Sequence, residues 1–248
     1  AVITEVDYRT GRRHNMANLT AVSKMKGIKI IWDLCHSTGA FPVDLAGCGA
    51  ELAVGCSYKY LNGGPGAPAF LYVSPELQDR IQPPLSGWMG HETPFNFDLD
   101  YRPAEGVSRN LCGTPSIISM SALDAALDLW KDVDLELVRQ KSQKLFNLFA
   151  DSVKELCPDS GLSLKTVFPE AERGSQIAFS HPHGYAIINA LIDHGVIGDF
   201  RAPDILRFGL TPLYLSFEEV YRAVVILSEI MQKRIWDQPK YHKRSLVT

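Results

Sequence analysis

Two charged residues lie where a pair of expected strands end. Asp33 directly follows the apolar run 28–32, and Lys59 follows a second apolar run at 51–57. In a mostly parallel α/β sheet the carboxyl ends of the strands meet at one edge, and ligands bind outside that edge. A carboxylate and an amine in these positions can face each other across a bound molecule. The sequence therefore predicts a ligand site built around Asp33 and Lys59.

The neighbours of Lys59 indicate what kind of ligand this would be. An aspartate at a strand end often only caps a loop, and a lysine is most often a solvated surface amine. Here, however, Lys59 lies between Tyr58 and Tyr60, and the Asn-Gly-Gly-Pro-Gly loop at 62–66 lets the backbone approach a ligand closely. Such an amine suits imine formation with a carbonyl cofactor such as pyridoxal phosphate, whose ring nitrogen pairs with an acidic residue such as Asp33.

The spacing of apolar residues predicts the elements that position this pair. Strands are expected at 2–7, 28–32, 51–57 and 69–73, and helices at 16–26, 115–130 and 133–156, with Thr114 as the N-cap of the second helix. Further strands are expected near 162–167, 175–180, 196–200 and 204–209, with helices at 184–194 and 216–235.

This order of elements predicts the fold class and the division into domains. Strands that alternate with helices or long loops indicate an α/β fold with a mostly parallel sheet, and the later pattern indicates a smaller α+β domain. We place the boundary near residue 150, which gives domains at 1–150 and 151–248. The irregular stretch 83–113, rich in Pro, Gly and aromatic residues, is typical of a long ordered loop at an active site or interface.

Composition narrows the class of partner. The 248 residues are 46% hydrophobic, and 25 Lys plus Arg against 28 Asp plus Glu give a net charge of −3. No long block of one charge suggests nucleic acid or a charged membrane surface, and no apolar run reaches the length of a membrane span. Five cysteines without a CxxC pair indicate a reducing, cytoplasmic compartment. We expect a small-molecule partner and no metal.

The first residues look like the interior of a fold. An alternating β-branched run begins at Ala1 and continues to Tyr8, with no start methionine and no signal peptide. Chains rarely begin inside a core strand. We therefore expect the natural protein to continue ahead of Ala1.

Five stretches of the sequence resemble one known family. They are 32–45, 55–66, 85–91, 111–114 and 207–214. Together they resemble kynureninases, which are fold-type I pyridoxal phosphate enzymes with an aspartate aminotransferase-like fold. Among the kynureninases, the five stretches resemble the bacterial members most. The Tyr-Lys-Tyr-Leu-Asn-Gly-Gly-Pro-Gly run within 55–66 separates this family from the cysteine desulfurases, which carry a His-Lys pair there.

The resemblance implies a role for five candidate site residues of the large domain. Lys59 would hold the cofactor as a Schiff base, and Asp33 would pair with its pyridine nitrogen. His36 would lie close to cofactor and substrate, and Tyr58 would bind the cofactor phosphate and serve as a proton donor. Trp88 would also bind this phosphate, although a tryptophan in this position could equally fill a core.

The resemblance also implies roles for Thr114 and Arg207. Thr114 would reach the phosphate of the neighbouring subunit in a homodimer that shares its sites across the interface, although helix capping alone also explains this residue. Arg207 would bind the α-carboxylate of an amino-acid substrate through its planar donor fork. A guanidinium within an apolar strand in any case needs an anionic partner. His91 is a weaker candidate for substrate contact.

The resemblance implies hydrolysis of L-kynurenine to anthranilate and L-alanine in tryptophan degradation, with 3-hydroxy-L-kynurenine as a second candidate substrate. It also implies that an aromatic residue stacking on the cofactor and further phosphate contacts come from a segment ahead of Ala1. Two alternatives stay open. One is another fold-type I lyase, a cysteine desulfurase or selenocysteine lyase with Cys112 as its nucleophile, and the other is a non-catalytic fragment that acts in dimerisation.

Overall fold

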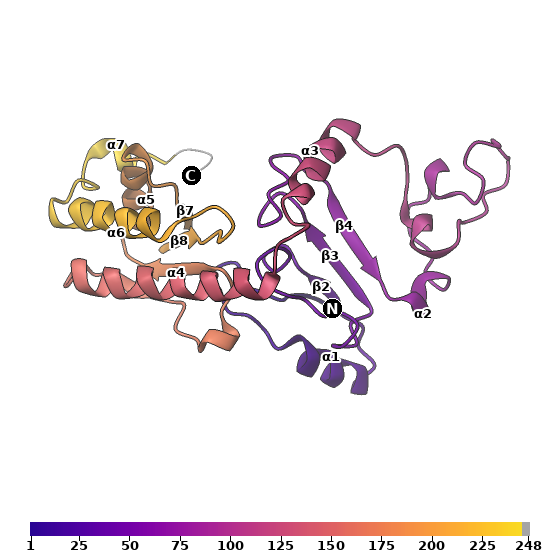
Figure 1. The fold of residues 1–248 in the computed structure, drawn as a ribbon, viewed down its shortest axis with the longest axis horizontal. Coiled ribbons are helices and arrows are strands. Elements are labelled where there is room, and N and C mark those ends of the chain that lie inside the picture. The colour runs from indigo at the N-terminus through magenta and orange to yellow at the C-terminus, as the bar shows by residue number, and fades with distance from the viewer. Residues whose placement is uncertain (245–248) are drawn as a thin grey trace. The chain divides into compact units, whose positions relative to one another are not determined.

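The chain folds into two compact units. The structure is a computed structural model that describes residues 1–244 (Figure 1). Unit 1 contains Ala1–Glu5, Asn15–Thr38 and Val43–Asp132, and unit 2 contains Val6–His14, Gly39–Pro42 and the chain from Val133 onward. The division therefore falls at Asp132–Val133 and not near residue 150. Residue 150 lies inside helix α4 (Leu135–Leu156), which packs against helix α6 (Phe217–Gln232) of the same unit.

Unit 1 is built on a four-stranded sheet. Its strands are β1 (Val2–Thr4), β2 (Ile31–Asp33), β3 (Leu52–Cys56) and β4 (Ala69–Val73), and they lie in the order β1-β2-β3-β4. The pairs β1–β2 and β2–β3 are parallel, whereas β4 runs antiparallel to β3 (Figure 1). The prediction of a mostly parallel sheet is confirmed. The carboxyl ends of the three parallel strands share one edge, and Asp33 is the last residue of β2.

One face of this sheet forms the core of unit 1. Trp32 is fully buried among apolar residues of β2, β3 and helix α1 (Met16–Met25), and its indole Nε1 donates a hydrogen bond to Thr20 Oγ1 at 3.1 Å. Successive side chains of a strand point to opposite faces of its sheet. Because Trp32 occupies the core face, Asp33 is directed to the opposite face.

Short helical segments and loops follow the sheet in unit 1. They are α2 (Pro75–Gln78), two 3-10 turns at Trp88–Gly90 and Gly106–Asn110, and α3 (Ile117–Asp128). The prediction that Thr114 caps α3 is wrong. Ser116 is the N-cap, because its backbone is still extended and its carbonyl accepts the first helical hydrogen bond, from Met120 N–H at 2.9 Å. Thr114 is exposed and lies outside the helix.

Unit 2 is an α+β unit, as predicted. Its antiparallel sheet has the order β5-β6-β8-β7, with β5 at Ser163–Leu164, β6 at Gln176–Ser180, β7 at Asp199–Arg201 and β8 at Ile205–Gly209. A 3-10 turn at Glu170–Glu172 and helices α5 (Gly184–Asp193) and α7 (Pro239–His242) complete it, together with α4 and α6.

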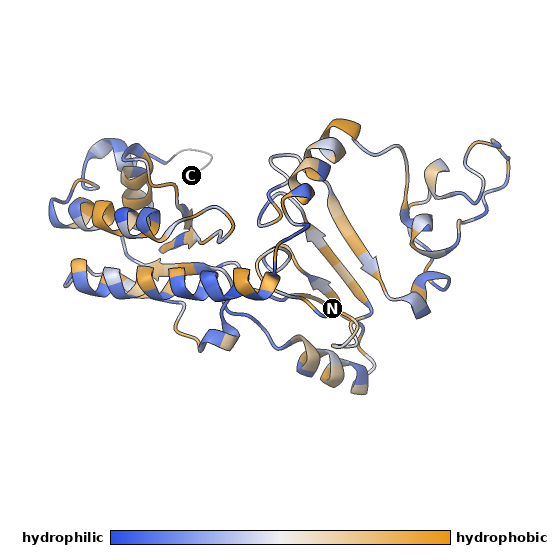
Figure 2. Ribbon diagram, in the orientation of Figure 1, coloured by the Kyte–Doolittle hydropathy of each residue, from blue (hydrophilic) through white to orange (hydrophobic). Residues whose placement is uncertain are grey.

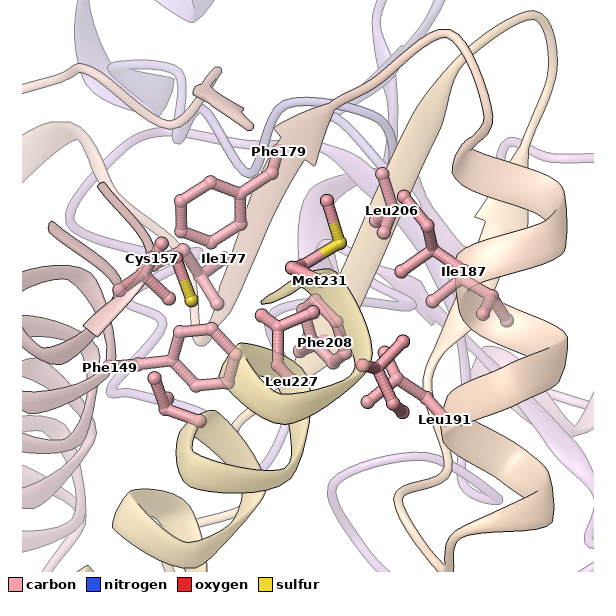
Figure 3. Close-up of a cluster of buried hydrophobic side chains, with 14 of the residues drawn as sticks. Phe149, Cys157, Ile177, Phe179, Ile187, Leu191, Leu206, Phe208, Leu227 and Met231 are labelled. Carbon is pink, nitrogen blue, oxygen red and sulfur yellow. The ribbon is translucent and has the colours of Figure 1, made fainter. Parts of the chain in front are cut away.

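The core of unit 2 lies between its helices and its sheet. Phe149 from α4, Phe208 from β8 and Leu227 from α6 meet in one apolar cluster, and the rings of Phe149 and Phe208 lie 5.0 Å apart (Figure 3). α4 carries both hydrophobic and hydrophilic residues along its length (Figure 2), so only one of its faces joins this core. Within residues 1–244 no helix combines the length and the apolar character needed to cross a membrane.

Candidate active site

Asp33 lies at the carboxyl-end edge of the unit 1 sheet. It pairs in register with Val54 of β3, and the next residue continues the ladder through a hydrogen bond from Leu34 N–H to the Val54 carbonyl at 2.8 Å. Asp33 is half-buried, and its Oδ1 accepts a hydrogen bond from Cys35 N–H at 2.8 Å. This bond fixes the carboxylate at the strand end.

The Cys35 side chain lies beside Asp33 and Cys56. Burial raises the pKa of its thiol to about 12, and hydrogen bonds with Asp33 and Cys56 add to the effect. The Cys35 sulfur is therefore protonated at neutral pH. It is not a nucleophile.

The loop after β2 is tied to the end of β3. The Cys56 thiol donates to the Cys35 carbonyl at 3.6 Å, and Cys56 is the last residue of β3, three positions before Lys59. His36 lies half-buried in the turn that follows Cys35, and this turn closes through a hydrogen bond from Ser37 N–H to Leu34 O at 2.9 Å. The structure thus brings the segments that carry Asp33, His36 and Lys59 to one edge of the sheet.

Lys59 begins a tight turn after β3. Asn62 N–H donates to the Lys59 carbonyl at 3.0 Å, and Asn62 adopts the left-handed conformation, with φ at 61°. The Lys59 ammonium lies 5.4 Å from the centre of the Tyr58 ring, and no carboxylate pairs with it in the part of the chain that the structure describes. Lys59 is half-buried and Tyr58 is half-exposed. An amine without a carboxylate partner remains available to a carbonyl compound.

Helix α3 and Trp130, two residues beyond its end, hold this turn in place. The Trp130 indole Nε1 donates to the Leu61 carbonyl at 3.2 Å. A Cβ on Gly63 would lie 2.9 Å from Ala67 Cβ, 3.0 Å from the Ser57 carbonyl oxygen and 3.2 Å from Leu123 Cδ1, so a side chain there would displace the loop. The glycine-rich run therefore lets the Lys59 loop pack closely against α3.

Trp88 and the segment ending at Thr114 form a second group within unit 1. A Cβ on Gly87 would lie only 1.8 Å from the Cys112 carbonyl oxygen, so the two backbones are in direct contact. The Trp88 Nε1 atom would lie 3.9 Å from a Cβ on Gly113, which places the indole beside the residue before Thr114. Trp88 is 45% exposed and meets Phe95 edge to face at 5.6 Å. It does not fill the core, so its indole N–H is available to a ligand.

Arg207 has its anionic partner within unit 2. Its Nε donates to Asp199 Oδ2 at 3.1 Å, its Nη2 donates to the same oxygen, and its Nη1 donates to the Tyr8 carbonyl at 2.7 Å. Sequence reasoning expected an anionic partner but missed Asp199. The signal was present, because Asp199 and Arg207 are a directly opposed pair in the β7–β8 hairpin, but finding it required the register.

The His91 ring forms hydrogen bonds within its own loop. Its Nδ1 accepts a hydrogen bond from Thr93 N–H at 2.9 Å, which places the ring proton on Nε2, 3.1 Å from the Asp100 carbonyl. Both ring nitrogens are therefore used within its own loop. Across residues 1–244 no group of three or more His, Cys, Asp or Glu side chains is arranged to hold a metal ion.

Comparisons with known proteins agree with this architecture. The family profile described as "Kynureninase C-terminal domain" matches residues 138–227. Kynureninase from Pseudomonas fluorescens is 49% identical over 247 residues, which are 100% of this chain and 59% of that protein. Kynureninase from Deinococcus radiodurans is 52% identical over 232 residues, which are 94% of this chain and 57% of that protein. The chain thus spans less than two thirds of the relatives it matches.

Solved structures show the same fold at much lower identity. The apo cysteine desulfurase from Thermococcus onnurineus NA1 matches with a TM-score of 0.76 and 21% identity, over 94% of this chain and 60% of that chain. Alanine–glyoxylate aminotransferase from Nostoc sp. matches with a TM-score of 0.68 and 19% identity, over 93% of this chain and 61% of that chain. The chain therefore belongs to the fold class that these two proteins share.

Sequence identity narrows this class to one family. The relatives that are about half identical to the chain across nearly all of its length are kynureninases. The chain is similar to kynureninases over nearly all of its length, and the kynureninase C-terminal domain profile matches residues 138–227.

Proposed function

We propose that the protein containing this chain is a kynureninase, which hydrolyses L-kynurenine to anthranilate and L-alanine with pyridoxal phosphate as its cofactor. One observation carries the proposal. Within a sequence about half identical to kynureninases, Asp33 ends β2 and Lys59 lies in the turn after β3 at the same sheet edge, and the Lys59 amine has no carboxylate partner in the described chain.

The residues at this edge fit the cofactor. Lys59 would bind its aldehyde carbon covalently, and Asp33 would face its ring nitrogen from the end of β2. His36 would lie beside the ring, and the exposed Tyr58 hydroxyl and the Trp88 indole would bind the phosphate. The cradle is supported by the Gly63 backbone, where the neighbours leave no room for a side chain. When bound, the cofactor supplies an electron sink for the α-carbon of an amino acid.

Two residues of unit 1 would move protons. The Lys59 amine would remove the proton from the α-carbon of the bound amino acid. Water would add to the side-chain ketone, the bond between Cβ and Cγ would break, and the acyl group would leave as the carboxylate of anthranilate. The Tyr58 hydroxyl would supply a proton as the three-carbon product is completed to alanine. Arg207 would hold the substrate α-carboxylate.

We also propose a cytoplasmic homodimer in which Thr114 of each subunit contacts the cofactor phosphate of the other. Several large apolar side chains of unit 1 are exposed, among them Phe97 at 83% and Ile118 at 86%. Contiguous exposed apolar side chains commonly mark a protein interface. All five cysteines are free thiols, which supports a reducing compartment.

A cysteine desulfurase is the second candidate, because the fold also matches that class. Its chemistry needs a mobile nucleophilic cysteine, and Cys112 is exposed. However, the Cys112 backbone is in direct contact with Gly87, and its thiol donates to the Leu85 carbonyl at 3.5 Å. A Cys112→Ser variant of the full-length protein separates the two. Anthranilate release at the wild-type rate supports kynureninase, and sulfur release from cysteine that is lost in this variant supports the desulfurase.

Replacement of the lysine tests the proposed activity. Full-length protein with pyridoxal phosphate should release anthranilate from L-kynurenine, and Lys59→Ala should lower this rate by at least about a thousandfold, since both the attachment point and a proton carrier are lost. Lys144→Ala, on the exposed side of α4, is the matched control and should keep the wild-type rate. Wild-type protein that releases no anthranilate contradicts the proposal.

A further inference from the structure

The guanidinium of Arg207 is held on two sides by other residues of unit 2. Asp199 lies directly opposite Arg207 across the β7–β8 pair, and its Oδ2 accepts hydrogen bonds from both Nε and Nη2. The Tyr8 carbonyl accepts from Nη1 at 2.7 Å. Because contacts at Nε, Nη2 and Nη1 lie around the planar group, they fix both its position and its plane.

The Tyr8 carbonyl is itself held in place. Asp7 closes the turn that carries Tyr8, since its Oδ1 accepts from Arg9 N–H at 3.2 Å and its Oδ2 accepts from Thr10 N–H at 3.1 Å. The buried Gln176 side chain donates from Nε2 to the Tyr8 carbonyl at 3.0 Å and to the Asp7 carbonyl at 3.1 Å. The acceptor that meets Arg207 therefore belongs to a fixed turn.

One carboxylate oxygen of Asp199 is not used by the hairpin. This oxygen, Oδ1, is buried and has no hydrogen-bond partner in the part of the chain that the structure describes. The Arg201 Nη2 atom lies 3.6 Å from Oδ2, so that oxygen faces two guanidinium groups. A buried carboxylate oxygen without a hydrogen-bond partner costs stability, although the Asp199 side chain as a whole is 32% exposed. The Arg207 side chain is 11% exposed, so only a small part of it reaches solvent.

Arg207 keeps two N–H donors that a ligand can use. A guanidinium has five N–H donors, and Asp199 and Tyr8 use three of them. One N–H remains on each Nη atom of Arg207. Two N–H donors from a group of fixed orientation suit a bidentate carboxylate. A long arginine side chain that is ordered before binding also loses less conformational entropy when the ligand binds.

We infer that Asp199, together with the Tyr8 carbonyl, is a positioning residue that presets Arg207 to bind the α-carboxylate of the substrate. This inference rests on the proposed function. Asp199 acts on the carboxylate only through Arg207. Its effect should therefore appear in discrimination between ligands with and without an α-carboxylate, and it should disappear when Arg207 is absent.

The test uses full-length holoenzyme and compares L-alanine with ethylamine, which lacks the carboxylate. Binding of each ligand is followed by the change in cofactor absorbance. Asp199→Asn should lower the preference for L-alanine about tenfold, the factor that 1.4 kcal/mol represents, and should raise the KM for L-kynurenine by a similar factor with kcat within about twofold. Asp199→Glu should recover part of the preference. In an Arg207→Ala background Asp199→Asn should have no further effect.

Asp204→Asn, in the turn of the same hairpin, is the matched control and should leave the preference unchanged. An Asp199→Asn protein that melts at a lower temperature but keeps the wild-type preference and KM overturns the inference, because Asp199 would then serve only the fold. If Asp199→Asn does not fold, Asp199→Glu decides in the same way, since an unchanged preference overturns the inference. Wild-type holoenzyme that binds L-alanine but releases no anthranilate overturns the proposed function alone.

Discussion

The Cys56 thiol donates a hydrogen bond to the Cys35 carbonyl at 3.6 Å, and so links the loop that carries Asp33 and His36 to the strand that leads to Lys59. The two loops are separated along the chain but adjacent on the sheet, because β2 and β3 are parallel neighbours. The cofactor-binding roles that we propose for these residues depend on this adjacency.

The state of the cysteines gives a first prediction. The raised pKa values of Cys35, about 12, and Cys157, about 11, have burial as their main cause. Since thiolate is the reactive form, at pH 8 these two thiols should remain unlabelled by maleimide in the folded protein. Peptide mapping checks this, with unfolded protein as the control in which all five cysteines label. Labelling of Cys35 in folded protein at the unfolded rate would argue against a protonated thiol packed beside Asp33.

Gly87 gives a second prediction. Gly87→Ala places a methyl group 1.8 Å from the Cys112 carbonyl oxygen, and backbone cannot move aside as a flexible side chain can. We expect destabilisation of about 1–3 kcal/mol, as for other overpacked sites, and weaker cofactor binding because Trp88 is displaced. Chemical denaturation and cofactor titration measure the two effects. Gly209→Ala is the control, since a Cβ there has no neighbour within 4 Å. Equal stability of the two variants contradicts the close contact.

His181 predicts how stability changes with pH. Burial, and to a smaller degree the neighbouring His183, lowers the pKa of His181 below its ordinary value of 6.5. Between the lowered and the ordinary value the unfolded chain binds more protons than the folded chain, so stability falls as the pH drops below about 6.5. His181→Asn should reduce this slope while its side-chain oxygen still accepts from His183 N–H, the bond that His181 Nδ1 forms at 3.0 Å.

Denaturation curves between pH 5.5 and 7.5, analysed for the transition of unit 2, measure this slope. His14→Asn, a change of the same type at a histidine outside the ring contacts of His181 and His183, serves as the control for histidine replacement itself. A slope in His181→Asn as steep as in the wild type would assign the pH dependence to other groups.

The shared site predicts complementation between two inactive proteins. In a mixed dimer of Lys59→Ala and Thr114→Val subunits, one site receives both changes and the other receives none. At limiting cofactor, equal mixing should therefore restore about a quarter of wild-type anthranilate release, because half of the dimers are mixed and each has one intact site. Each variant alone should stay well below this level. No recovery after confirmed subunit exchange would place Thr114 in its own subunit's site or outside the site.

Local sequence pattern predicted most elements of the fold. The apolar spacing located β2 through β4, and the strand ends located Asp33 and Lys59 at one edge. The start of α3 was wrong by two residues, because Ser116 replaces Thr114 as the N-cap and the two residue types cap almost equally well.

Contacts between distant parts of the chain could not be predicted in this way. Val6–His14 and Gly39–Pro42 belong to unit 2, although they lie among unit 1 residues in the sequence. Gln176 meets the Tyr8 turn across 168 residues. Asp199 and Arg207 pair only once the register of their hairpin is known, which the alternation of apolar residues alone leaves open.

Chemical attachment of the cofactor to one lysine tests the central claim most directly. Full-length protein is incubated with pyridoxal phosphate, reduced with borohydride, digested and analysed by mass spectrometry. The account predicts a single stoichiometric cofactor adduct on Lys59, with loss of the absorption band near the visible edge in Lys59→Ala and its retention in Lys144→Ala. An adduct on another lysine, or a band that persists in Lys59→Ala, would contradict the assignment of Lys59 and the site built around it.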